Sequence, residues 1–325
     1  MSPTPVEGCR ARNDSEVTEE LKHLASSHHG VILPRDLGQL GLDDCAMRAA
    51  LSRLHKVGRG VYTIERPASP LQVHYFRAVA ALRRQPGRTA AHVSAAVIHQ
   101  LPLFRPDLEM VHLFGAESSR LGKRGTALVH RPIWGPSMTV DGVPVTTVAQ
   151  TIVDCARTQS RETAVVMADS ALHLKLTTVA ELREAAARVA NLKGASRARS
   201  VVELADGRAE SVGETRARLI CLDAGIGVTP QVEVPDDDGL VITRLDLKVD
   251  GYCLGLAFDG RGKYHEYLKP GELPDQKYWE EKLQAELVED RGWVRVNVYW
   301  NMLDHPELVV GRINRGKARA LKLAR

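Results

Sequence analysis

The fold of the last third of the chain is decided by two segments, Glu210–Glu214 (ESVGE) and Ala257–Tyr264 (AFDGRGKY), with Asp246 in an alternating apolar run between them. Carboxylates that lie close together can share a divalent metal ion, and a lysine beside them can orient or activate a water molecule. The stretch therefore predicts the chemistry of metal-dependent phosphodiester cleavage, with Asp246, Asp259 and Lys263 as candidate catalytic residues.

The spacing around Asp246 predicts a pair of antiparallel strands. Runs of strand-forming residues at 242–249 and 253–259 flank Asp250-Gly251, which is a strong signal for a hairpin turn. Pairing around that turn brings position 257 opposite Asp246 on one face of the sheet.

Three further acidic residues extend this site. Asp259 is two residues beyond position 257, so it is expected on the same face of the sheet. Glu210 and Glu214 are four residues apart, which predicts that they share one face of a helix. The predicted ligands for Mg²⁺ or Mn²⁺, if the site is active, are Asp246, Asp259, Glu214 and Glu210.

Composition is that of an ordinary globular protein with a mildly basic charge. The chain has 325 residues, enough for two or three domains, and 44% of them are hydrophobic and 26% charged. The net charge of +4 is compatible with nucleic-acid binding without requiring it. The end of the chain has no acidic residue after Glu307 and carries a basic series. Its members are Arg312, Arg315, Lys317, Arg319, Lys322 and Arg325.

Cysteine usage and hydropathy indicate the compartment. Five cysteines are scattered without a CxxC pair, which favours reduced, mostly buried thiols. No window approaches the roughly 20 apolar residues of a membrane span, and residues 1–13 lack an apolar signal core. We therefore expect a cytoplasmic protein that has no membrane partner.

Hydrophobic patterning divides the chain into three predicted domains, 14–66, 71–206 and 207–325. The first domain is expected to contain three short helices followed by a β-hairpin. The second is expected to be mixed α/β, and the third to combine helices with strands. The expected fold class is therefore α+β and multidomain, beginning with a winged helix-turn-helix.

The third helix and the hairpin of the first domain carry the residues of interest. Asp43 and Asp44 favour a helix start, after which Met47, Ala50, Leu51 and Leu54 form one buried stripe. The opposite face carries Arg48, Ser52, His55 and Lys56, and a tight turn at 58–60 leads into a strand. In a winged helix this face enters the major groove and the hairpin touches phosphates. The residues placed against double-stranded DNA are Arg48, Ser52, Arg53, Lys56 and Arg59, although the same pattern is typical of a solvated helix face.

The sequence of the middle domain says less about function. Its pattern predicts a helix through Tyr75 and Leu82, a turn at 140–143 and a helix ending near Arg157. His92 and His99 are seven residues apart, a regular helical spacing. This spacing is compatible both with a metal ion shared by the two histidines and with ordinary packing.

The first half of the chain resembles the abortive-infection type IV antitoxin family (AbiEi-like). The resemblance rests on Gly30-Val31, on Leu51–Leu54 (LSRL), on Gly58–Tyr62 (GRGVY), and on segments at 92–96 and 147–157. It implies a winged helix that binds operator DNA and represses a toxin–antitoxin pair, a nucleotidyltransferase-like toxin as partner, and a homodimer spanning two half-sites.

The last 120 residues or so resemble endonuclease-like domains related to very-short-patch repair enzymes, within the PD-(D/E)XK superfamily. The matching residues, in order, are Glu210, Glu214, Asp246, Phe258–Gly260, Lys263-Tyr264, Glu281-Lys282 and Gly292-Trp293. The family pattern usually has Glu at position 257, where this chain has Ala257. Loss of one metal-binding carboxylate weakens divalent-ion binding and the activation of water.

Three hypotheses follow. The first is a DNA-binding transcriptional regulator of the antitoxin kind with a degenerate nuclease-like domain. The alternative is a metal-dependent DNA endonuclease to which the winged helix delivers the substrate. The third is an interaction scaffold that neutralises a toxin without touching DNA.

Overall fold

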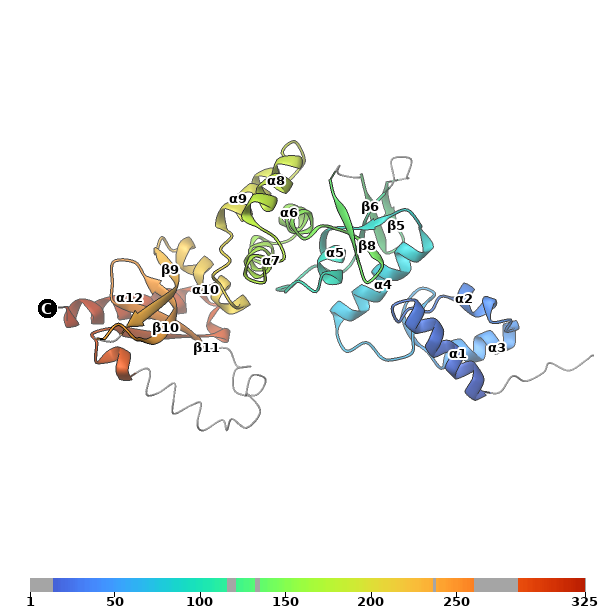
Figure 1. Cartoon of the computed structure of the whole chain (residues 1–325), viewed down its shortest axis with the longest axis horizontal. Helices are drawn as coiled ribbons and strands as arrows, with labels where there is room; N and C mark the ends of the chain where they lie inside the picture. Colours follow the sequence, from blue (N-terminus) through green and yellow to red (C-terminus); the bar gives the residue numbers. More distant parts are fainter. Residues whose placement is uncertain (1–13, 116–120, 132–134, 236–237, 260–285, 325) are drawn as a thin grey trace, which may run out of the picture. The chain divides into compact units, whose positions relative to one another are not determined.

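The computed structural model describes residues 14–115, 121–131, 135–235, 238–259 and 286–324 (Figure 1). It is a mixed α/β structure with several sheets, and it divides into two compact units. The first unit contains residues 1–100 and 107–147, and the second contains 101–106 and 148–325. The predicted mixed α/β, multidomain character is confirmed. The predicted boundaries at 66–71 and 206–207 each lie inside one unit, and the three-domain division stays a prediction.

Three short helices and a hairpin open the first unit. The helices are α1 (Asp14–Ser27), α2 (Pro34–Gln39) and α3 (Asp44–Ser52), and the antiparallel strands are β1 (His55–Gly58) and β2 (Val61–Thr63). The side chain of Asp43 caps α3 by accepting a 2.8 Å hydrogen bond from Ala46 N, as the sequence predicts. The small core consists of Leu21, Ala25, Ile32, Leu37, Leu42 and Ala50.

The predicted extent of the third helix is wrong at its C-terminal end. The helix stops at Ser52, and His55 and Lys56 lie in β1, where they pair with Thr63 and Tyr62. The physical reason is the burial of Val57, since the hairpin places it in the apolar core of the first unit. Pairing of β1 with β2 therefore overrides the helical pattern.

The hairpin and the short helices are fixed to a long helix, α4 (Pro70–Arg84), by arginine side chains. Arg77 Nε donates to Val57 O at 2.8 Å, and Arg84 donates to the carbonyl oxygens of Arg59 and Gly60 in the hairpin turn. Arg83 donates to Val31 O at 2.9 Å and pairs with the buried Asp36. These bonds satisfy backbone oxygens at the hairpin turn and just before α2.

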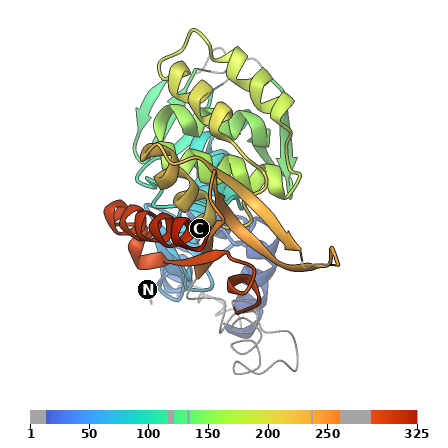
Figure 2. The same cartoon turned by 90° about the vertical axis from the view of Figure 1, so that its left-hand side faces the viewer.

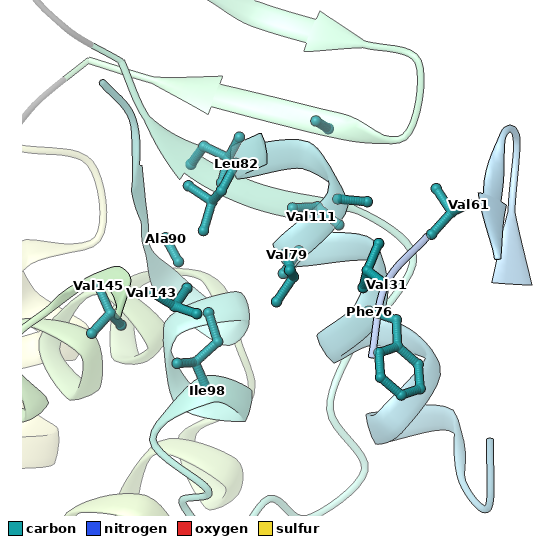
Figure 3. Close-up of a cluster of buried hydrophobic side chains, with 14 of the residues drawn as sticks. Val31, Val61, Phe76, Val79, Leu82, Ala90, Ile98, Val111, Val143 and Val145 are labelled. Atoms are coloured by element: carbon teal, nitrogen blue, oxygen red, sulfur yellow. The ribbon is translucent and has the colours of Figure 1, made fainter. Parts of the chain in front are cut away.

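A six-stranded sheet forms the rest of the first unit, with strand order β5-β6-β4-β3-β8-β7. The elements are β3 (Thr89–Ala90), α5 (His92–Ile98), β4 (Val111–Phe114), β5 (Gly122–Arg124), β6 (Ala127–His130), β7 (Ser137–Val140) and β8 (Val143–Thr146). The predicted turn between β7 and β8 is confirmed, with Asp141 and Gly142 at positive φ. Figure 3 shows the apolar side chains gathered around α4 and α5.

Helices make up the first part of the second unit. They are α6 (Val148–Thr158), α7 (Arg161–His173), α8 (Val179–Arg188), α9 (Ala195–Leu204) and α10 (Val212–Asp223). Asp169 of α7 connects α10 to this bundle, since it accepts hydrogen bonds from Thr215 Oγ1 and Arg218 at 2.8 and 2.7 Å. Asp169 and Arg218 are both buried.

The second sheet has the order β12-β11-β10-β9 and packs its apolar face on α10 and α12 (Figures 1 and 2). Its elements are β9 (Val228–Pro235), β10 (Val241–Val249), β11 (Leu254–Asp259), β12 (Val294–Tyr299), the 3₁₀ turn η1 (Trp300–Met302) and α12 (Pro306–Leu323). Strands β9, β10 and β11 are antiparallel, and β11 and β12 are parallel. Gly213 allows α10 to approach this sheet, since a Cβ there would lie 2.1 Å from the ring of Phe258.

In the part of the chain that the structure describes, no helix is long and apolar enough to span a bilayer. The four cysteines in these residues are free thiols. Cys155 and Cys221 are buried, whereas Cys45 and Cys253 are exposed, so the prediction of mostly buried thiols holds for half of them.

Candidate functional site

The polar face of the second sheet carries the predicted carboxylate site. Leu247 pairs with Leu256 and Lys248 with Gly255, and this register places position 257 opposite Asp246, as predicted. The neighbouring strands extend the row, because Gln231 falls opposite Asp246 on β9 and Asn297 pairs with Ala257 on β12. Four half-buried side chains therefore cross the sheet in one line: Gln231, Asp246, Ala257 and Asn297.

Glu214 joins Asp246 at this site. Its Oε2 accepts hydrogen bonds from Gln231 Nε2 and Glu210 N, at 2.8 and 2.9 Å, and its Oε1 accepts one from Ser211 Oγ at 2.8 Å. Burial raises the pKa of Glu214, and the negative charge of Asp246 raises it further, while the hydrogen bond from Glu210 N lowers it. Asp246 in turn accepts a hydrogen bond from Phe258 N through Oδ2. The two carboxylates thus interact electrostatically, and both are held by hydrogen bonds.

The prediction that Glu210 and Glu214 share a helix face is wrong. Helix α10 begins at Val212 with Ser211 as its N-cap, so Glu210 precedes the helix. The hydroxyl of Ser211 accepts a hydrogen bond from Glu214 N, which explains why the helix starts there. Glu210 is exposed and forms a 2.6 Å ion pair with Arg244 of β10.

The remaining members of the predicted site are at or beyond the edge of what the structure describes. Asp259 ends β11, and its Cα pairs with that of Tyr299. Lys263, Tyr264 and the segment 281–282 lie outside the described residues. The predicted catalytic roles of Asp259 and Lys263 therefore stay predictions.

A basic cavity of about 730 Å³ lies between β12 and α12. Its cationic lining consists of Arg295, Arg312, Arg315, Arg319 and Lys322, and none of the residues that line it in the described structure is acidic. Asn297 also lines it, so the cavity begins one strand away from Ala257. Arg312 donates to Asn297 O at 3.1 Å. Such a concentration of positive charge attracts anions such as phosphate groups.

The five residues predicted to contact DNA are all exposed in the first unit. Arg48 and Ser52 lie on α3, Arg53 follows as its C-cap, Lys56 lies on β1 and Arg59 lies in the hairpin turn. Helix and hairpin thus present their cations to solvent, as a phosphate-binding surface requires.

Three histidines come together elsewhere in the first unit. His92 at the start of α5, His112 on β4 and His130 on β6 each offer one ligand atom, and these atoms all lie within 4.8 Å of one another. Burial and the neighbouring imidazoles of His130 and His74 lower the pKa of His112 to about 4, so this imidazole is neutral at pH 7. His99, which the sequence pairs with His92, instead directs Nε2 to Thr146 O at 2.7 Å.

Comparison with known proteins gives relatives in one genus. No protein-family model matches the chain. It is 30% identical over 200 residues to uncharacterized protein Rv2248 of Mycobacterium tuberculosis (strain ATCC 25618 / H37Rv) and, equally, to uncharacterized protein MT2308 of strain CDC 1551 / Oshkosh. The match covers 61% of this chain and 69% of each relative. The chain belongs to the family of these mycobacterial proteins. The match is longer than any of the three predicted domains, so the shared sequence extends beyond one of them.

Sequence reasoning on this member of the family missed two features. Arg295 escaped notice because it is distant from the basic end of the chain, although the alternation of valines over 294–298 places Arg295 and Asn297 on one face of a strand. His112 and His130 escaped notice because they are far from His92 in sequence and follow no metal-ligand spacing.

Proposed function

We propose that the chain is a DNA-binding transcriptional regulator of the type IV antitoxin kind, whose last domain holds nucleic acid without cutting it. One observation carries the proposal: α3 and the β1–β2 hairpin expose every residue that the sequence assigns to DNA contact. These residues are Arg48, Ser52, Arg53, Lys56 and Arg59.

The arrangement suits a winged helix. In that motif the last helix lies in the major groove and the hairpin contacts the sugar–phosphate backbone. The cations around α3 and β1 supply phosphate contacts, which contribute affinity, while Ser52 can hydrogen-bond to a base edge. Arg84 stabilises the hairpin turn by donating to the carbonyl oxygens of Arg59 and Gly60, so the hairpin is positioned before DNA binds.

The polar face of the second sheet supports a binding role for the last domain. Helix α10, the three antiparallel strands, the parallel strand β12 and α12 support the proposal that this domain is a PD-(D/E)XK relative. Asp246 and Glu214 interact, but the position between Asp246 and Asn297 carries the methyl group of Ala257. A methyl group cannot bind a metal ion, whereas the neighbouring basic cavity can bind phosphates.

An antitoxin role adds two partners to this proposal. One is a nucleotidyltransferase-like toxin, and the other is a second copy of the chain, since paired winged helices bind two half-sites about one helical turn apart. Both rest on the resemblance of the first half of the chain.

Selection of duplexes from a random library by the full chain tests the proposal. We expect one enriched sequence motif for the wild type, the same motif with weaker enrichment for Arg53→Ala, and wild-type enrichment for Lys22→Ala. Lys22 is the matched control because it is an exposed cation of the same unit that lies on α1. Failure of the wild type to enrich any sequence would contradict sequence-specific regulation.

The interaction of Glu214 with Asp246 favours one second candidate, a metal-dependent DNA endonuclease. Plasmid DNA incubated with the chain and Mn²⁺ distinguishes the two. We expect no cleavage by the wild type and cleavage by Ala257→Glu, which restores a third carboxylate. Cleavage by the wild type that Asp246→Ala abolishes would establish the endonuclease instead.

A further inference from the structure

The histidine cluster of the first unit belongs to neither the exposed cations of α3 nor the carboxylate face of the second sheet. We propose that His92, His112 and His130 bind one zinc ion through an imidazole nitrogen of each ring. This site is independent of the proposed DNA-binding function, and it joins α5 to two strands of the six-stranded sheet.

The backbone places the three rings together. Strands β4 and β6 are parallel, with Phe114 paired to His130, so His112 and His130 are diagonal neighbours on one face of the sheet. Ala91 N donates to His112 O at 3.0 Å, which holds the start of α5, and therefore His92, beside β4. Sheet pairing thus fixes the site before any ion binds.

The separation of the rings is close to that of a zinc site. His112 Nδ1 and His130 Nε2 are 2.9 Å apart and share a hydrogen bond. Two nitrogens bound to tetrahedral zinc at about 2.0–2.1 Å are about 3.3 Å apart, so this pair needs a shift of a few tenths of an ångström. The ligand atom of His92 lies within 4.8 Å of both. Zinc replaces the hydrogen between the two nitrogens, and the imidazole that loses this hydrogen takes one from solvent on its other nitrogen. The displaced hydrogen passes to solvent, so one hydrogen leaves this imidazole and one is taken up by it.

Neighbouring residues position the cluster. Ser94 Oγ accepts a hydrogen bond from the backbone N of His112 and also bonds to His74 Nε2, at 2.8 Å in each case, which fixes β4 at this point. Phe114 packs edge-on against His92 and His130, with ring centroids 5.9 and 6.3 Å apart. His92 has a positive φ of 50°, a conformation that costs energy and is concentrated at functional sites.

Three imidazoles leave the fourth position of a tetrahedral zinc ion open to water. His92 is buried, whereas His112 and His130 are half-buried, so part of the cluster is accessible to solvent. This is the ligand set of a zinc ion that can still exchange a ligand, in contrast to a closed four-ligand structural site.

Zinc binding by the full chain, stripped with a chelator and then dialysed against Zn²⁺, tests the site. We expect one zinc ion per chain and a rise in melting temperature with zinc concentration. His112→Gln and His130→Gln should each lower the affinity at least about 100-fold. His99→Gln is the matched control, because His99 is a half-buried histidine of the same unit whose carbonyl contact an amide can replace. It should bind zinc as the wild type does.

Two results would overturn the proposal: no stoichiometric zinc in the wild type, or unchanged affinity in both cluster variants. The second result would place the metal elsewhere, for example at the carboxylates of the second sheet. If the variants do not fold, the absorption spectrum of the Co²⁺-loaded wild type decides. An intense visible spectrum typical of four-coordinate cobalt supports the site, and a weak six-coordinate spectrum contradicts it.

Discussion

The arginines on and directly after α3 and those of α10 show how differently one residue type is used in the two units. Arg48 and Arg53 are exposed at the surface of the first unit. Arg216 of α10 is 2% exposed, and it contacts Glu162 and Asp304 at 2.6 and 2.8 Å while lying over the ring of Phe104. Burial therefore distinguishes arginines that stabilise the fold from arginines that are accessible to a ligand, and the number of cations does not.

The largest expected effect of this difference is on stability. Arg218→Ala leaves the buried carboxylate of Asp169 without its charged partner, and breaking a buried pair in this way costs about 3–5 kcal/mol. Arg48→Ala removes an exposed side chain and should change the free energy of unfolding by less than about 0.5 kcal/mol. Urea unfolding measures both. A loss below 1 kcal/mol in Arg218→Ala would contradict the assigned role of the buried pair.

The buried acid of α6 gives the second effect, which depends on pH. Burial raises the pKa of Asp154 from 3.8 to about 6, and the 3.2 Å contact with Arg157 only partly opposes this rise. The folded state binds the proton of Asp154 more tightly than the unfolded state does. The contribution of this group to the free energy of unfolding is therefore complete below pH 4 and is lost as the pH rises through 6. The loss is at most about 3 kcal/mol.

Asp154→Asn should therefore flatten the dependence of unfolding free energy on pH between 4 and 7. Glu16→Gln, at an exposed site on α1, is the control and should leave the dependence unchanged. An equally steep pH dependence in Asp154→Asn and the wild type would show that another group is responsible.

The smallest expected effect concerns the basic cavity beside β12. Arg315 and Arg319 are exposed, so replacing either with alanine should leave stability unchanged. Each substitution should remove about one phosphate contact in non-specific DNA binding. The slope of log K against log salt should therefore fall by about 1. Arg199→Ala, at an exposed position on α9, is the control. Identical salt dependence in all three variants would contradict the proposal that the cavity is part of the surface that binds nucleic acid.

Local patterns were sufficient for much of the fold. The capping of α3 by Asp43, the turn at Asp141-Gly142 and the register that brings position 257 opposite Asp246 were all predictable. Each depends on residues close together in sequence whose side chains or backbone angles favour one arrangement. The sequence therefore predicted the position of Ala257 opposite Asp246 correctly.

Other features were not predictable in the same way, because a local pattern allowed two arrangements or because strands distant in sequence pair. The helical pattern continues through His55 and Lys56, but strand pairing with Thr63 and Tyr62 ends α3 earlier. Glu210 shares its spacing with Glu214, yet Ser211 is the better cap and excludes it from the helix. The histidine cluster depends on the pairing of β4 with β6, which no spacing in the sequence specifies.

The most direct test of the central claim is the salt dependence of duplex binding by the full chain, measured by fluorescence anisotropy with the selected sequence. We expect the double variant Arg53→Ala/Lys56→Ala to bind at least about 10-fold more weakly than the wild type, with a slope of log K against log salt reduced by about 2. Lys22→Ala should retain the wild-type affinity and slope. Unchanged affinity and slope in the double variant would contradict the claim that α3 and the hairpin bind DNA.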